Sequence, residues 1–289
     1  MKNILTLTKN LAEKESFNST NIEGVKIFRI SQSQSRLPLS YAQGIVFVIQ
    51  GAETIYFGGE KYIYDSQNYL VLPVPIIAEC EVRASSEKPF LALTIDIDLS
   101  MLEGIVYQLN KTDALTHIDF QNSVRGLFVS PVSDDIKNTV FRLLSILSDS
   151  VASEVIGSQT VRELLFRVFI NNRGKEFYNL TAKEAELSRI DNALKWMHQN
   201  FKQKVSISEL ANKVHMGEST FHRVFKDITK QSPTQYLKKL RLSHARNLII
   251  ENGYQVQQAA FNSGYNSTTQ FAREFKRLYG KSPSEFYKA

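Results

Sequence analysis

Two stretches near the end of the chain repeat one pattern: FHRVFKDITKQSPTQYLKK at 221–239 and FAREFKRLYGKSPSEFYKA at 271–289. Each has an arginine between two aromatic residues, a lysine after them and then a Ser-Pro pair. Phenylalanines at i and i+4 share one face of a helix, whereas the arginine between them projects from the other side. The repeat therefore predicts two copies of one helical unit with an exposed basic face. The matched positions, 50 residues apart, are Phe221/Phe271, Arg223/Arg273, Phe225/Phe275, Lys226/Lys276, Ser232/Ser282, Pro233/Pro283 and Tyr236/Phe286.

A second helical segment and a tight turn precede each copy. Residues 207–228 predict a helix, a turn and a second helix, in the segments ISELANKV, HMG and ESTFHRVFKDI. The same order returns over 256–278, in the segments VQQAAFNS, GYN and STTQFAREFKRL. Each first helix carries a small residue, Ala211 or Ala260, as closely crossing helices require. We therefore predict a duplicated helix-turn-helix in an all-α module, joined by a long helix over 233–250. Capping-box helix starts are predicted at Ser206, Ser232 and Ser282.

The charge of the chain is concentrated in this module. The whole chain has a net charge of +6 and a pI near 9.2. Residues 186–289 hold 17 Lys and Arg against 8 Asp and Glu, a net charge of +9, which leaves 1–185 at −3. This asymmetry is typical of a nucleic-acid-binding module joined to a nearly neutral domain.

Residues 25–98 form a series of short apolar runs separated by turns. Paired glycines, Gly58 and Gly59, mark a hairpin, and turn signals recur about every ten residues. The pattern predicts an all-β sandwich or barrel, with the uniformly apolar GIVFVIQG (44–51) as a central strand. The predicted strands are VKIFRI, GIVFVIQG, AETIYF, EKYIYD, NYLVLP, IIAECEVR and PFLALTIDID.

A small barrel rich in aromatic residues can hold a small, partly apolar ligand, although the same residues can simply fill a core. The only cysteine, Cys80, falls on the apolar face of its strand. We expect it to line the barrel and not to sense oxidants, because burial and the flanking Glu79 and Glu81 disfavour the thiolate. The predicted effector pocket comprises Phe47, Tyr56, Tyr64, Cys80 and Phe90.

The histidines exclude an imidazole metal cluster in the barrel, because all five lie outside the predicted strands. The sequence also contains no motif that would support an enzyme using carboxylates alone. We therefore predict no catalytic residue, no metal site and no cofactor. The five histidines are His117, His198, His215, His222 and His244.

Two amphipathic helices are predicted after the strands, over 133–149 and 158–170. Their apolar stripes pack either on the barrel or against a second subunit, and we expect a homodimer through one of them. The polar segment NNRGKE (171–176) predicts a linker over 171–185. The predicted domains are then 1–170 and 186–289.

No segment of the sequence is long and apolar enough to predict a membrane span. YLVLPVPIIA (69–78) is about half the length that a bilayer requires and contains two prolines. Charged residues interrupt the first 17 residues, which predicts a short helix or arm and no secretory signal. A single cysteine fits a reducing cytoplasm.

These motifs resemble the AraC/XylS family of bacterial transcription regulators. The words that carry the resemblance are LANKVHMGESTFHRVFK (210–226), LRLSHARNLI (240–249) and GYNSTTQFAREFKRLYGKSPSEF (264–286). The region 49–98 also looks like the cupin-like N-terminal domain of one AraC subfamily. The sequence departs from the family pattern at Gly217, where a serine cap is usual, and in the residues Ala259 and Tyr265.

The resemblance implies a cupin-like β-barrel domain with flanking helices that binds an effector or dimerises, followed by a double helix-turn-helix that reads promoter DNA. It implies operator DNA, a small-molecule effector and RNA polymerase as partners. Arginine can donate two hydrogen bonds to a guanine edge, and lysine can neutralise phosphate. The base-contacting positions that it implies are Ser219, His222, Arg223, Thr268, Thr269 and Arg273, with Ala272 at a thymine methyl. The implied DNA-backbone contacts are Lys226, Arg241 and Lys276.

We therefore expect a cytoplasmic, sequence-specific transcription regulator, controlled by a small molecule in the N-terminal barrel. In the alternatives, the barrel is a catalytic pocket or a purely dimerising module without an effector.

Overall fold

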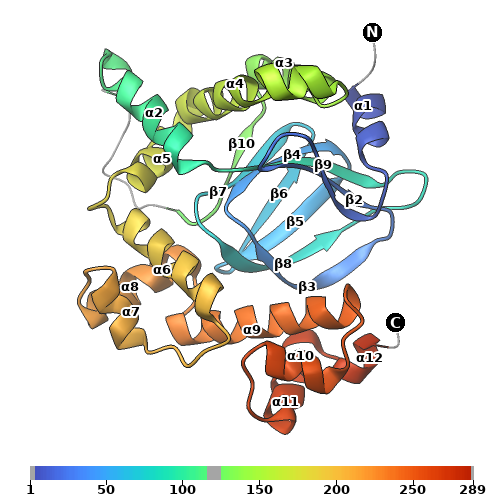
Figure 1. The fold of residues 1–289 in the computed structure, drawn as a ribbon, viewed down its shortest axis with the longest axis vertical. Helices are drawn as coiled ribbons and strands as arrows, with labels where there is room; N and C mark the ends of the chain where they lie inside the picture. The colour runs from blue at the N-terminus through green and yellow to red at the C-terminus, as the bar shows by residue number, and fades with distance from the viewer. Residues whose placement is uncertain (1–3, 116–124, 288–289) are drawn as a thin grey trace. The chain divides into compact units, whose positions relative to one another are not determined.

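The computed structural model describes residues 4–115 and 125–287 (Figure 1). They divide into two compact units. The first contains Met1–Arg36, Ala42–Val74 and Cys80–Ser188. The second contains Leu37–Tyr41, Pro75–Glu79 and Arg189–Ala289.

An antiparallel β half-barrel forms the N-terminal half, as the turn spacing predicts. Its strands occur in the order β1-β2-β9-β4-β7-β6-β5-β8-β3, and β10 pairs with β7. The predicted central strand, β4, lies between β9 and β7, which explains why both of its faces are apolar. The strands are β1 (Ser16–Ser19), β2 (Val25–Ile30), β3 (Gln34–Tyr41), β4 (Gly44–Gln50), β5 (Ala52–Phe57), β6 (Glu60–Asp65), β7 (Asn68–Leu72), β8 (Ile76–Val82), β9 (Phe90–Asp96) and β10 (Phe128–Pro131).

Three of these strands, β1, β3 and β10, are not predicted by the sequence patterns. Strands β1 and β10 have only four residues each, too few for an alternation to be recognised. Strand β3 contains Pro38, which argues against a central strand, and it lies at one end of the strand order.

Helices accompany the half-barrel. The apolar stripes of α3 and α4 are buried, and the two helices pack against each other. Both stripes are therefore covered within the chain, as the first of the two alternatives predicts, and a homodimer stays a prediction. The helices are α1 (Ile4–Leu11), α2 (Leu99–Leu109), α3 (Asp134–Ile146), α4 (Ser150–Val168) and α5 (Gly174–Thr181), with a 3-10 turn η1 (Asp113–Leu115) and a π-helical turn η2 (Phe169–Arg173).

The segment predicted as a linker, 171–185, is largely helical: residues 171–181 lie in η2 and α5, and only 182–185 connect α5 to α6. Phe177 is fully buried and Leu180 nearly so, which gives α5 an apolar face despite its polar neighbours. The domain boundaries at 170 and 186 stay a prediction.

The C-terminal part is all α-helical. A long helix, α9, contacts four of the shorter helices, α8, α10, α11 and α12. Ser232 and Gln235 form the predicted capping box at its start, with Pro233 in the first turn. The helices are α6 (Glu186–Asn200), α7 (Ile207–Lys213), α8 (Glu218–Thr229), α9 (Pro233–Ile250), α10 (Val256–Asn262), α11 (Thr268–Tyr279) and α12 (Pro283–Tyr287).

Candidate nucleic-acid interface

Helix α8 has the two faces that the repeat predicts. Phe221 and Phe225 are fully buried, with ring centroids 5.5 Å apart. Arg223 lies between them in sequence and is exposed, as is Lys226. The helix is thus held by its aromatic face and presents its basic face outward.

Two other predicted base contacts lie on the same helix. Ser219, in its first turn, is exposed. His222 is half-buried, with its ring edge-on to Phe221 at 6.3 Å. One side of α8 therefore carries Ser219, His222 and Arg223.

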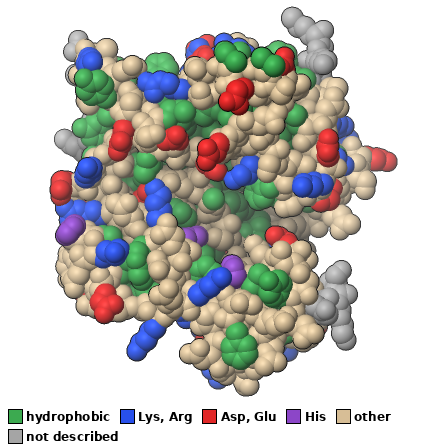
Figure 2. All heavy atoms as spheres, viewed as in Figure 1, with side chains coloured by type: hydrophobic (Ala, Val, Ile, Leu, Met, Phe, Trp, Pro, Cys, Tyr) green, Lys and Arg blue, Asp and Glu red, His purple; other side chains and the backbone are tan. Residues whose placement is uncertain are grey.

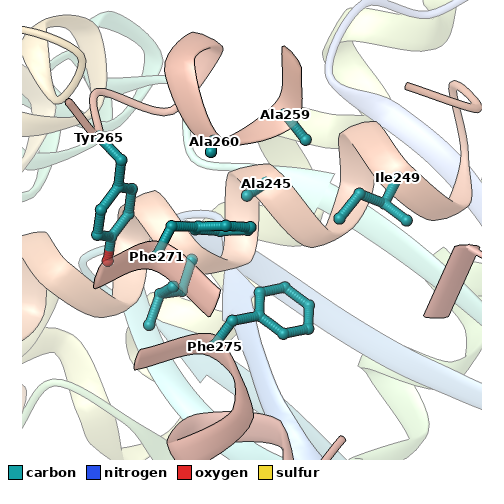
Figure 3. Close-up of a cluster of buried hydrophobic side chains, with 8 residues drawn as sticks. Ala245, Ile249, Ala259, Ala260, Tyr265, Phe271 and Phe275 are labelled. Atoms are coloured by element: carbon teal, nitrogen blue, oxygen red, sulfur yellow. The ribbon is translucent and has the colours of Figure 1, made fainter. Parts of the chain in front are cut away.

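Helix α11 repeats this arrangement. Its phenylalanines, Phe271 and Phe275, are fully buried beside Tyr265 in a cluster that includes residues of α9 and α10 (Figure 3). Ala245 and Ala260 in this cluster leave room for the aromatic rings. The full cluster is Leu242, Ala245, Ile249, Ala259, Ala260, Tyr265, Phe271 and Phe275.

The outer face of α11 carries the predicted contact residues. Thr269, Arg273 and Lys276 are exposed, whereas Thr268 and Ala272 are half-buried. Ser267 accepts a hydrogen bond from the Gln270 backbone N–H at 3.2 Å and caps the helix. The threonines therefore lie in a fixed first turn.

A polar network, which sequence reasoning missed, fixes α11 to α9. Glu274 pairs with Lys238 of α9 at 2.9 Å and accepts a hydrogen bond from the Tyr265 hydroxyl at 2.9 Å. Burial raises the pKa of Glu274, but the hydrogen bonds from Lys238, Tyr265 and Gln270 outweigh it and lower the pKa. The network therefore sets the orientation of the second helix. No spacing in the sequence would identify it, because Lys238 and Glu274 lie far apart in the chain.

The arginine of α8 has a local partner. Arg223 lies 3.5 Å from Asp227, and both side chains are more than 60% exposed. An exposed pair of this kind contributes little stability, so the guanidinium can exchange its partner for a guanine edge. Isolated basic side chains project from the helices of the second unit in Figure 2, where the surface is otherwise mostly uncharged.

Arg241 does not have the exposed position of a phosphate contact. Its guanidinium donates to the carbonyl oxygen of Phe201 at 2.7 Å and to that of Gln203 at 2.6 Å. These bonds hold the loop after α6 against α9. Arg241 thus has a structural role, and its predicted contact with the DNA backbone stays a prediction.

The structure separates the predicted effector residues into two groups. Tyr64 donates a hydrogen bond to buried Glu53, and Phe47 contacts Tyr69 with ring centroids 5.3 Å apart. Cys80 is fully buried and lies close enough to Tyr64 to affect its pKa, which burial and Glu53 raise strongly.

Tyr56 and Phe90 are not part of that group. Tyr56 donates to Glu81 at 3.0 Å, and Glu81 alternates with Cys80 along β8 and so faces the other side. Phe47 pairs with Leu93, three residues from Phe90, so Phe47 and Phe90 also lie on opposite faces of the sheet. The predicted pocket of five residues is therefore not one cluster.

Among residues 4–115 and 125–287, no group of three or more His, Cys, Asp or Glu side chains could hold a metal ion. Four of the histidines lie in the helical part, and His117 falls outside the described residues. No described helix is long and apolar enough to cross a membrane.

Comparison with known proteins identifies the family. The family model "AraC-type transcriptional regulator N-terminus" matches residues 21–176, and a "Helix-turn-helix domain" model matches 210–289. The chain belongs to the AraC family of transcriptional regulators. It is a DNA-binding regulator, and the family is not one of enzymes.

Similar curated proteins and solved structures span nearly the whole chain. The thermoregulatory protein LcrF of Yersinia pestis is 25% identical over 244 residues, which cover 84% of this chain and 88% of LcrF. The virulence regulon transcriptional activator VirF of Yersinia enterocolitica has the same identity and coverage. A crystal structure of ToxT from Vibrio cholerae has a TM-score of 0.60 at 13% identity and covers 95% of this chain and 98% of ToxT. A second, of wild-type ToxT bound to an unsaturated fatty acid, has a TM-score of 0.57 at 13% identity, with coverages of 91% and 94%. The ToxT structures confirm the fold, a β half-barrel with helices followed by the helical DNA-binding part.

Proposed function

We propose that this AraC-family regulator reads operator DNA through α8 and α11, one in each of two successive major grooves. The observation that carries the proposal is the repeated placement of Arg223 and Arg273, each exposed between two buried phenylalanines. An arginine on such a face can read guanine through O6 and N7. The proposed base contacts are Ser219, His222, Arg223, Thr268, Thr269 and Arg273, with Lys226 and Lys276 on phosphates.

The test is a footprint and a binding series on one operator. Two helices one turn of DNA apart, roughly 34 Å, should protect an asymmetric site of roughly 17 to 20 base pairs. Arg223→Ala or Arg273→Ala should cost about 1 to 3 kcal/mol at one base position. Lys226→Ala should weaken binding to all sequences alike and flatten the salt dependence. Equal losses on operator and random DNA for both arginines would refute base reading.

We further propose that a small molecule bound in the half-barrel controls DNA binding. The buried group of Phe47, Tyr64 and Cys80 supports this proposal, together with the buried carboxylate of Glu53, because a few polar groups in an apolar interior are typical of ligand sites. The fatty acid of the ToxT structure is a property of that protein and serves here as a first compound to test. Operator affinity measured with and without a metabolite library is the decisive experiment.

A homodimer is the remaining part of the proposal, and exposed residues of α4 support it. Val151, Val155 and Ile156 are 71%, 62% and 47% exposed, and the first two are four residues apart on one helix face. Two copies joined there would place two reading modules on repeated half-sites and present them to RNA polymerase in the bacterial cytoplasm. Sedimentation should give a dimer that Val155→Glu dissociates, whereas a monomer at tens of micromolar would refute it. A barrel that only dimerises, with no effector, is the second candidate.

A further inference from the structure

Lys175, in the first turn of α5, has a buried ammonium group without a partner. The residue is 8% exposed, and its Nζ has no hydrogen-bond partner among the described residues. An ammonium carries three donors, and burying an unpaired charge is costly. Most buried polar groups in proteins are satisfied, so an unsatisfied one requires an explanation such as a bound ion.

The neighbouring carboxylate does not supply the missing partner. Glu176 follows Lys175 directly and is also buried, at 3% exposure. Successive residues of an α-helix point about 100° apart, and Glu176 has an interaction of its own. Lys175 Nζ therefore remains a buried donor without a partner.

Lys175 follows a π-helical turn that is hydrogen-bonded to two strands of the half-barrel. Asn171, one turn before it, donates hydrogen bonds to the Tyr69 hydroxyl at 3.3 Å and to the Pro131 carbonyl oxygen at 3.2 Å. Phe169 stacks on Phe177 at 6.1 Å, and α5 packs against α2 and η2. The helix is thus fixed to β7 and β10, and π-helical turns are frequent at functional sites.

This anchor connects Lys175 to the half-barrel residues of the proposed effector site. The ring of Tyr69, which accepts the bond from Asn171, also contacts Phe47. Asn171, in the middle of η2, therefore reaches the sheet face that carries the apolar part of that site. A ligand lying on this face would have its charged end near the start of α5.

We propose that Lys175 binds the oxyanion of a small molecule, a carboxylate or a phosphate, and that this molecule is the effector. The proposal rests on the proposed control by a ligand in the half-barrel. A compact ammonium on a flexible stem matches a single oxyanion as a point charge. The anion would satisfy the donors that the chain leaves unpaired.

The experiment is thermal unfolding of the full chain with sodium octanoate, with inorganic phosphate, and with sodium chloride at equal ionic strength. At least one of the two oxyanions should raise the melting temperature above the chloride control, and the one that does identifies the source of the oxyanion. In Lys175→Met the affinity for that anion should fall about 10- to 100-fold, as expected for a lost hydrogen bond to a charged group. Lys183→Met, at an exposed lysine of the same region, should retain it.

Three results would overturn the proposal. They are no shift from either oxyanion, an equal shift in Lys175→Met, or a lower melting temperature of Lys175→Met in chloride alone, which would indicate a structural role. If Lys175→Met does not fold, Lys175→Gln, which keeps a polar group of similar length, replaces it, and an unchanged anion affinity in that variant counts against the site. Anion binding without any change in operator affinity would leave the Lys175 site in place and refute the proposed control of DNA binding.

Discussion

The two helix-turn-helix units are copies with different turns. The turn bond from the backbone N–H of Met216 to the Ala211 carbonyl recurs from Tyr265 to Ala260, an offset of 49 residues. The buried phenylalanines of α8 and α11 are 50 residues apart. The second turn thus has one extra residue before its recognition helix, and this helix begins with a serine cap where the first begins with Gly217, which has no side-chain cap. A residue added in the turn leaves the helix packing unchanged.

The copies also differ at the two positions with left-handed backbone. His215 and Lys230 have φ of 54° and 60° in the first copy. The equivalent positions of the second copy are Gly264 and Gly280, with φ of 82° and 75°. Because a side chain in this region costs about 1 to 2 kcal/mol, the first copy carries backbone strain that the second avoids.

A third difference is the charge of the recognition helices. Over their 12 residues, α8 has two basic and two acidic side chains, whereas α11 has three basic and one acidic. Asp227, which pairs with Arg223, is replaced by Arg277 at the equivalent position. Glu274, the acidic residue of α11, is held by Lys238 and Tyr265. The basic side chains of the second copy are therefore balanced by fewer acidic side chains. We expect the second copy to contribute more to non-specific DNA affinity.

The largest effect expected from these differences is at Gly264. A Cβ there would lie 2.7 Å from the Lys202 carbonyl oxygen, so Gly264→Ala combines a backbone clash with left-handed strain. We expect a loss of about 2 to 5 kcal/mol in the free energy of unfolding, measured by urea denaturation. Gly280→Ala is the matched control. Its Cβ would meet nothing within 4 Å, so it should lose only about 1 kcal/mol. Equal losses for the two variants would show that the contact with Lys202 is unimportant.

The second largest effect is expected from acid, which should lower the free energy of unfolding through a histidine that contacts the first copy. His198 Nε2 lies 2.8 Å from the Tyr236 hydroxyl, and burial lowers the pKa of His198 to about 4. The unfolded chain therefore binds more protons below the ordinary histidine pKa of about 6.5, and stability falls as the pH drops from there towards 4. We expect a loss of about 2 to 3 kcal/mol over this window. The second copy has Phe286 where the first has Tyr236.

The control for this pH effect is His198→Gln, which keeps a polar group but cannot become charged. It should remove most of the pH dependence between 6.5 and 4. Burial also lowers the pKa of His244, which changes stability in the same direction, so the comparison of the two proteins isolates His198. An unchanged pH dependence in His198→Gln would contradict the assignment.

The sequence predicts those parts of the molecule that rest on local periodicity. The duplicated helices follow from Phe221 and Phe225 and their copies, because the spacing of buried aromatics fixes a helix face. The Lys238–Glu274 pair could not be predicted, since it depends on how α11 packs on α9. The structural role of Arg241 is hidden for the same reason, because its acceptors are backbone carbonyls. The split of the effector residues depends on strand register, which composition does not reveal.

A smaller effect is expected at the end of α8. Lys230→Gly should stabilise the protein by about 0.5 to 1 kcal/mol, because the relief of the left-handed strain outweighs the greater chain entropy that glycine loses on folding. The N–H of this residue bonds the Lys226 carbonyl at 2.8 Å, and glycine preserves that bond. The measurement is the urea midpoint, with Lys230→Ala as the control that keeps the strain. A destabilised Lys230→Gly would mean that the lysine side chain has a role that its exposure does not suggest.

The smallest effect tests the charge difference directly. Asp227→Asn removes the ion pair with Arg223 and one negative charge from the outer face of α8. Because the pair is exposed, we expect DNA binding to tighten by only about 0.2 to 1 kcal/mol at low salt, on operator and random DNA alike, and the gain to fade at higher salt. Arg277→Ala at the equivalent position of α11 should weaken binding and reduce the salt slope by about one. Fluorescence anisotropy on both DNAs over a salt series gives both numbers. If Asp227→Asn tightens binding to the operator alone, Asp227 restrains base reading by Arg223, and the difference between the copies concerns specificity and not charge.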